Sequence, residues 1–181
     1  MRILALAALT VLAAAPAAAV PADHSIDGLF AQLARASSSD DAKPIEQEIL
    51  TQFLQSGSPT VDLLMSRIDA LAQAGDTATA AKVLDDVTKI APTYAEGWHH
   101  RGILEADAGQ DAAAMISLQK TVDLNPREFQ ALMELGDMLA QYGAKPAALA
   151  SYKRALALDP HLEGLDKRVE DLSRAVEGDK I

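Results

Sequence analysis

The chain has 181 residues, 26 of them acidic and 16 basic, for a formal net charge of −10, and it contains no cysteine. The absence of cysteine excludes disulfide bonds, thiolate metal sites and cysteine nucleophiles, and the acidic balance argues against general nucleic-acid binding, which needs clustered Lys and Arg. Only 4% of the residues are aromatic, while alanine is abundant. Because alanine has the highest helix propensity and aromatic residues favour strands, the composition predicts an all-α fold.

Residues 1–22 have the features of a secretory signal peptide. Arg2 precedes a long apolar run, and small residues suit cleavage after Ala19 or after Ala22. An uncleaved membrane anchor is the alternative, but the run is alanine-rich, is interrupted by Pro16 and lacks a charged stop on its far side. We therefore predict an exported protein, with no stable membrane insertion once the signal is removed.

A period of 34 residues organises the chain from residue 61 to residue 162. Five columns of residues repeat at this step: Pro92, Pro126 and Pro160; Gly75, Gly109 and Gly143; Ala80, Ala114 and Ala148; Leu64, Trp98 and Leu132; and Leu84, Leu118 and Tyr152. The repeating units are 61–94, 95–128 and 129–162. A fixed period of this length is the signature of solenoid proteins, in which each unit packs only against its neighbours.

Each unit is predicted to be a helix, a tight turn and a second helix. The repeated glycine ends the first helix, because a left-handed residue is favoured at a helix C-terminus. Asp76 and Asp111 are predicted to cap second helices, and the repeated proline ends the second helix. The repeated alanine allows the two helices to approach closely, and Gly102 and Gly136 face it across the hairpin.

Two further segments flank the three units. Residues 25–60 are predicted to form a degenerate helical hairpin in the same register, serving partly as an N-terminal cap; an unrelated helix pair is the alternative. Residues 162–177 carry an apolar stripe with steps of three and four residues and a charged opposite face. This pattern predicts a C-terminal capping helix. A coiled-coil seam is the alternative, for which two heptads are short.

The 34-residue helix pair resembles the tetratricopeptide repeat (TPR). The residues that carry the resemblance are Leu64, Leu71, Ala80, Leu84, Val87 and Pro92 in the first unit, Trp98, Gly102, Ala114, Leu118 and Pro126 in the second, and Leu132, Leu135, Gly136, Ala148, Tyr152, Ala155 and Pro160 in the third. The resemblance implies a right-handed α-solenoid of antiparallel helix pairs. Arg67, Arg101 and Glu105 depart from the family pattern, and we expect local packing in the first two units to differ there.

In this family the first helices of the repeats line a concave groove that holds peptides or partner helices. The register places the following residues in that groove: Asp62, Met65, Asp69, Glu96, His99, His100, Ile103, Asp107, Met133, Glu134 and Asp137. Six of these eleven residues are acidic and none is Lys or Arg. The resemblance therefore implies a protein or peptide ligand with a neutral or basic segment, which the methionines would contact adaptably.

No catalytic or cofactor motif accompanies the repeats. Glu96 and His100 lie four residues apart on a helix, but a metal site needs a third ligand and a second shell. The glycines are isolated, so no phosphate loop or nucleophile elbow is present. We predict no enzymatic activity, no metal and no cofactor. The predicted role is a scaffold or assembly factor in the periplasm; an accessory subunit or module of an envelope enzyme or maturation complex is the alternative.

Overall fold

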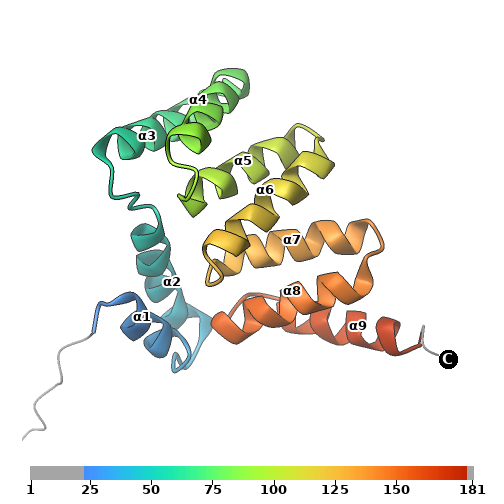
Figure 1. The fold of residues 1–181 in the computed structure, drawn as a ribbon. Helices are drawn as coiled ribbons and strands as arrows, with labels where there is room; N and C mark the ends of the chain where they lie inside the picture. The colour runs from blue at the N-terminus through green and yellow to red at the C-terminus, as the bar shows by residue number, and fades with distance from the viewer. Residues whose placement is uncertain (1–22, 179–181) are drawn as a thin grey trace, which may run out of the picture.

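The computed structural model describes residues 23–178, which form nine α-helices and no strand (Figure 1). The predicted signal peptide, residues 1–22, lies outside the described residues. Three antiparallel pairs make up the stack: α3 (Pro59–Gln73) with α4 (Thr77–Ile90), α5 (Ala95–Asp107) with α6 (Asp111–Leu124), and α7 (Phe129–Gln141) with α8 (Lys145–Leu158). The all-α fold of paired helices is therefore confirmed. In the described part of the chain, no helix is long and apolar enough to cross a membrane.

The turns inside the pairs have the predicted conformation. Gly75, Gly109 and Gly143 adopt φ values of 74°, 70° and 75°, the left-handed region that glycine enters at little cost. Asp76 caps α4 by accepting a hydrogen bond from the backbone N–H of Thr79 at 3.1 Å. The predicted cap at Asp111 is wrong, because Asp111 is the first helical residue of α6, and Gln110, the N-cap, makes no side-chain capping bond.

Small residues set the distance between the helices of each pair. Ala80, Ala114 and Ala148 are at most 1% exposed. A Cβ atom added to Gly102 would lie 2.9 Å from Leu118, and one added to Gly136 would lie 2.5 Å from the ring of Tyr152. The predicted close approach of the two helices is therefore confirmed.

The helix α9 (Leu165–Gly178) follows the third pair. It begins later than the predicted residue 162, because Gly164 adopts φ 71° and ends a turn there. Leu165 is fully buried against the third repeat, and Val169 and Leu172 pack beside it. The face with the charged residues stays exposed. This arrangement gives the end of the stack a polar outer surface, as solenoid ends require.

The N-terminal hairpin, α1 (Ile26–Leu33) and α2 (Ser39–Phe53), does not stack on α3. In Figure 1 it lies along one edge of the stack and returns toward α8. Phe30 meets the ring of Phe129 edge to face, with 6.4 Å between ring centroids. Phe129 shares a buried cluster with α1 and α2, and Leu158 and Leu162 pack against that cluster. The structure thus favours the alternative of an unrelated helix pair over a degenerate repeat.

Polar contacts fix the hairpin at both of its ends. The guanidinium of Arg127 lies 4.0 Å from the Phe30 ring centroid and donates to Asp27 Oδ1 at 2.5 Å. At the other end, Tyr94 Oη donates to the carbonyl of Leu54 at 2.8 Å. The hairpin is therefore a strap that is held by the third repeat and by the loop after the first.

A carboxyl pair adds to the contact with the third repeat. Burial raises the pKa of Asp159 and of Glu46, and the nearby charge of Asp159 acts on Glu46 in the same direction. Asp159 Oδ1 accepts a hydrogen bond from the backbone N–H of His161 at 2.9 Å. Glu46 therefore links α2 to the end of α8 rather than lying between the helices of its own hairpin.

Candidate partner-binding surface

The eleven residues predicted to bind a partner all lie on α3, α5 and α7, and we term this set the first-helix face. Four are exposed, namely Asp62, Asp69, Ile103 and Asp107, and four are half-buried, namely His100, Met133, Glu134 and Asp137. Met65, Glu96 and His99 are only 4%, 5% and 4% exposed. In this structure a partner has no access to these last three side chains, so they serve packing between the repeats.

A buried cluster of one histidine and three glutamates joins the second and third repeats. His99 Nε2 lies 2.9 Å from Glu134 Oε2 on α7, and His99 Nδ1 lies 3.4 Å from Glu96 Oε2 on its own helix. Glu128, which the groove prediction did not include, is fully buried and caps α7 by accepting from the N–H of Gln130. The buried atoms Glu96 Oε1 and Glu128 Oε2 have no hydrogen-bond partner within the described residues.

The protonation states in this cluster follow from its burial and its hydrogen bonds. Burial by itself lowers the pKa of His99, but its bonds to Glu134 and Glu96 outweigh that effect and raise the pKa to about 10. Burial raises the pKa of Glu128 to about 8, and the nearby charge of Glu96 acts in the same direction. At neutral pH the cluster therefore holds an imidazolium between two carboxylates, with Glu128 protonated.

His100, one of the half-buried residues of the first-helix face, is influenced by charges on its own helix and on both neighbouring first helices. Burial lowers the pKa of His100, and His99 does the same, while Asp69 on α3 and Glu134 on α7 act electrostatically to raise it. His100 is therefore a neutral side chain with carboxylates of two neighbouring helices close by. His100 on α5 therefore lies within electrostatic reach of one carboxylate on α3 and one on α7.

Besides Glu96 and Glu134, two further carboxylates of the predicted set accept hydrogen bonds from within the chain. Asp62 Oδ1 accepts a hydrogen bond from Ser56 Oγ at 2.5 Å, and this bond fixes the position of the linker that precedes α3. Asp137 accepts from Tyr152 Oη at 2.5 Å and from Arg168 Nη1 at 2.6 Å, which ties α7 to α8 and α9.

Asp69 and Asp107 are the freest carboxylates of the first-helix face. Both are exposed, and neither has a hydrogen-bond partner among the residues that the structure describes. These two side chains are therefore the most available acceptors on this face.

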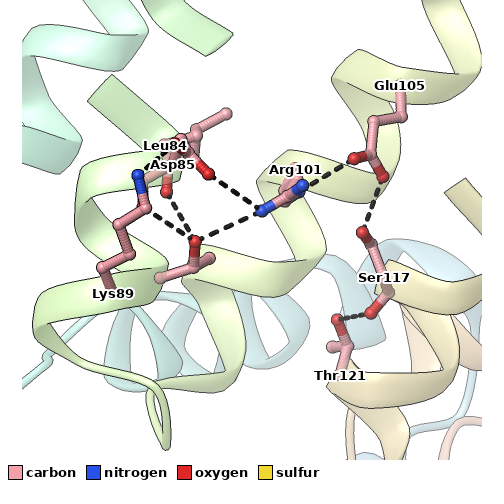
Figure 2. A network of polar contacts seen from close by, with 8 residues as sticks. Leu84, Asp85, Lys89, Arg101, Glu105, Ser117 and Thr121 are labelled. Atoms are coloured by element: carbon pink, nitrogen blue, oxygen red, sulfur yellow. Dashed lines mark hydrogen bonds and ion pairs between the residues drawn. The ribbon is translucent and has the colours of Figure 1, made fainter. Parts of the chain in front are cut away.

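A pocket of about 470 Å³ lies between α4 and α5, outside the predicted set except for Asp107. Leu84 and Leu104 contribute apolar walls, and Arg101 and Glu105 contribute charge. Figure 2 shows Arg101 between the two helices: its Nε donates to Glu105 Oε1 at 2.8 Å, and its Nη1 lies 3.4 Å from Asp85 Oδ1 on α4.

Arg101 and Glu105, which both depart from the family pattern, are partners in one ion pair, so each charged residue accounts for the presence of the other. Glu105 also accepts from the buried Ser117 Oγ on α6 at 2.6 Å (Figure 2). The partly buried charges at these two positions are thus paired and hydrogen-bonded, which offsets the cost of removing them from water. Their spacing of four residues on one helix is a sequence signal that could have identified the ion pair.

The Glu96–His100 pair considered as a metal ligand set does not form. Glu96 bonds to His99 instead. Within residues 23–178, no group of three or more His, Asp or Glu side chains is arranged to hold a metal ion.

Comparison with known sequences finds similarity to one repeat family. Residues 99–163 match the family profile described as tetratricopeptide repeat. A TPR repeat-containing protein of Rhizobium etli is 29% identical over 155 residues, which cover 86% of this chain and 76% of that protein.

Comparison with solved structures shows the same fold. The first TPR of Spaghetti (RPAP3), bound to an HSP90 peptide, matches with a TM-score of 0.59 at 17% identity, over 65% of this chain and 93% of that one. The Yersinia enterocolitica type III secretion chaperone SycD, in complex with a peptide of the translocator YopD, matches with a TM-score of 0.58 at 21% identity, over 68% and 97% of the two chains.

Proposed function

We propose that the chain is a tetratricopeptide repeat protein, as its similarity to that family over residues 99–163 supports, and that it is a non-catalytic scaffold or assembly factor that holds a peptide or helix of a partner on the first-helix face. TPR domains are typically protein–protein interaction modules that bind peptides, and the two solved structures named above each hold one. TPR proteins are generally non-catalytic, although some homologues belong to enzymes. The proposal for this chain rests on the exposed part of that face.

The observation that carries the proposal is the charge of the accessible residues. Asp69 and Asp107 are exposed and unpaired among the described residues, and the eleven-residue set contains no Lys or Arg. Ile103 is 39% exposed beside them and offers an apolar contact. A partner segment that is neutral or basic complements this face, because opposite charges steer association and select the partner.

The test uses the two free carboxylates. Candidate basic peptides, first captured by crosslinking in the native compartment, are titrated against the wild-type chain and against Asp69→Lys plus Asp107→Lys. We expect the double variant to weaken binding about tenfold, since two charge pairs of modest strength are reversed. The matched control, Asp86→Lys plus Asp166→Lys, changes the same net charge on exposed residues of α4 and α9. If both double variants bind the peptide with equal affinity, the proposal is refuted.

We also propose that the protein is exported to the periplasm, with cleavage of residues 1–22. The support is the charged start, apolar run and small-residue cleavage positions of that segment. A reporter enzyme that is active only outside the cytoplasm should be active when it is fused to the C-terminus of the full chain. A fusion lacking residues 1–22 should be inactive, and equal activity of both fusions would reject export by this segment.

The pocket between α4 and α5 supports a second candidate, an accessory subunit of an envelope enzyme or maturation complex. Its volume is in the range of small-molecule sites, and it combines apolar walls with charged side chains. A thermal-shift screen with divalent ions, chelator and small metabolites separates the two candidates. A saturable increase in Tm that Arg101→Gln abolishes favours the accessory role.

A further inference from the structure

The first repeat has an uncovered side. Because α1 and α2 fold back onto the third repeat, no helix within residues 23–178 packs before α3 in the stack (Figure 1). Leu63 is 71% exposed, and Arg67 and Ala70 are exposed beside it on the same helix. These three residues are termed the upstream face of α3.

The same positions are covered in the next two repeats. In the second repeat, a Cβ atom added to Gly97 would lie 2.9 Å from Val87 on α4, and Leu104 packs against the core of the first repeat. The third-repeat residues in this register are buried, with exposures of 0%, 4% and 9% for Ala131, Leu135 and Met138. In this register, a first helix therefore presents these positions to the second helix of the preceding repeat.

The second repeat also shows what covers an arginine in this register. Arg101 lies 34 residues after Arg67. Its Nη1 lies 3.4 Å from Asp85 Oδ1 and 3.4 Å from Thr88 Oγ1 (Figure 2). Both partners belong to α4, which also supplies the buried Leu84 and Val87 to the first-repeat core. Arg67 has no such partner among the described residues.

We propose that the upstream face docks an amphipathic helix of a partner protein, with apolar side chains on Leu63 and an acidic side chain paired with Arg67. The template for this helix is α4, which packs on the equivalent face of α5. The site is separate from the first-helix face, so it neither needs nor excludes binding there.

Two occupants from this chain fit the upstream face less well. The residue of α2 that corresponds in register to Asp85 is Thr51, which has no charge to offer Arg67. The outer face of α9 in a second copy carries exposed charged residues, including Lys167 and Glu170, and lacks large exposed apolar residues. A partner helix with both apolar and acidic side chains meets both requirements.

The probe is a synthetic, helix-stabilised peptide with the sequence of α4 (Thr77–Ile90), labelled with a fluorophore and titrated against the mature chain. We expect saturable binding that Leu63→Asp weakens about tenfold, because a charge replaces an apolar contact. Arg67→Glu should weaken it about two- to fivefold, as expected for one partly exposed ion pair. A peptide with Asp85→Arg should recover affinity for the Arg67→Glu chain.

Both protein substitutions are at exposed positions, and circular dichroism verifies that the variants stay folded. Arg154→Glu, an exposed site on α8, is the matched charge control and should bind like the wild type. Absence of saturable binding, or equal affinity for Arg67→Glu and Arg154→Glu, overturns the proposal. A doubled mass in light scattering that Leu63→Asp abolishes also overturns it, since the occupant would then be a second copy.

Discussion

A histidine that sequence reasoning places in a ligand groove is, in the structure, the centre of a buried ion-paired cluster. His99 connects Glu96 to Glu134, and Glu128 closes the cluster from the N-terminus of α7. Each charged group here has lost water and is stabilised by a neighbour of opposite charge or by a proton. Removing one partner would leave the others buried and uncompensated, which costs several kcal/mol.

The protonation of this cluster makes stability depend on pH. Glu128 has an ordinary pKa of 4.5 and a folded pKa of about 8. Between these values the folded chain holds a proton that the unfolded chain has lost, so the free energy of unfolding falls as pH rises through this window. His99 acts with the same sign between its ordinary value of 6.5 and about 10.

We therefore predict that Glu128→Gln gains stability relative to the wild type as pH rises from 5 to 9. The amide keeps a hydrogen-bond donor toward Glu96 and cannot ionise, so the relative gain should be about 1–3 kcal/mol. Urea unfolding at several pH values measures it. Glu170→Gln, exposed on α9, should show no such trend. Parallel curves for the wild type and Glu128→Gln would contradict the assigned protonation.

At the scale of the elements, close contact between α7 and α8 depends on the absence of one side chain. Gly136 faces the ring of Tyr152, which is 4% exposed and donates to Asp137. Burial raises the pKa of Tyr152 to about 12, so the phenol keeps its proton and its bond. The ring is thus fixed at one edge by packing and at the other by a hydrogen bond.

Gly136→Ala should destabilise the fold by about 1–3 kcal/mol, because the added methyl would lie 2.5 Å from the ring and force the helices apart. Thermal unfolding measures the loss. Gly178→Ala, where an added Cβ meets nothing within 4 Å, is the matched control and should be neutral. If Gly136→Ala is as stable as the control, α7 and α8 do not approach as closely as described.

At the scale of the whole molecule, the N-terminal hairpin joins parts of the stack that are distant in sequence. Arg127 reaches across about a hundred residues to contact Asp27 and the ring of Phe30. In a plain solenoid each repeat contacts only its neighbours. Here the strap adds a non-neighbour contact, which restrains the first repeat relative to the third.

Arg127→Ala should loosen the strap without unfolding the repeats. The loss of one ion pair and one cation–π contact is on the order of 1 kcal/mol, so amide hydrogen exchange in α1 and α2 should accelerate about fivefold. Exchange in α3 to α6 should stay unchanged. Arg174→Ala removes an ion pair confined to α9 and serves as the control. Uniform acceleration along the chain would show that the strap is not a separate unit.

The helices and their pairing over residues 61–162 could be predicted from local sequence patterns. Three signals were available: glycines that favour a left-handed conformation, helix propensity and the 34-residue step. Each reflects interactions within one helical hairpin or between adjacent hairpins, so each can be recognised in the sequence. The register also predicts that Asp69 and Asp107 belong to the first-helix face, and both side chains are exposed in the structure.

The docking position of the hairpin and the burial of particular polar residues could not be predicted in this way, because they depend on contacts between distant parts of the chain. The position of α1 depends on Phe129 and Arg127, which no local pattern connects to Phe30. The burial of Glu96 and His99 depends on the proton of Glu128 and the carboxylate of Glu134. Periodicity places a residue on a face of a helix, whereas the covering of that face depends on long-range packing and on the charges that meet there.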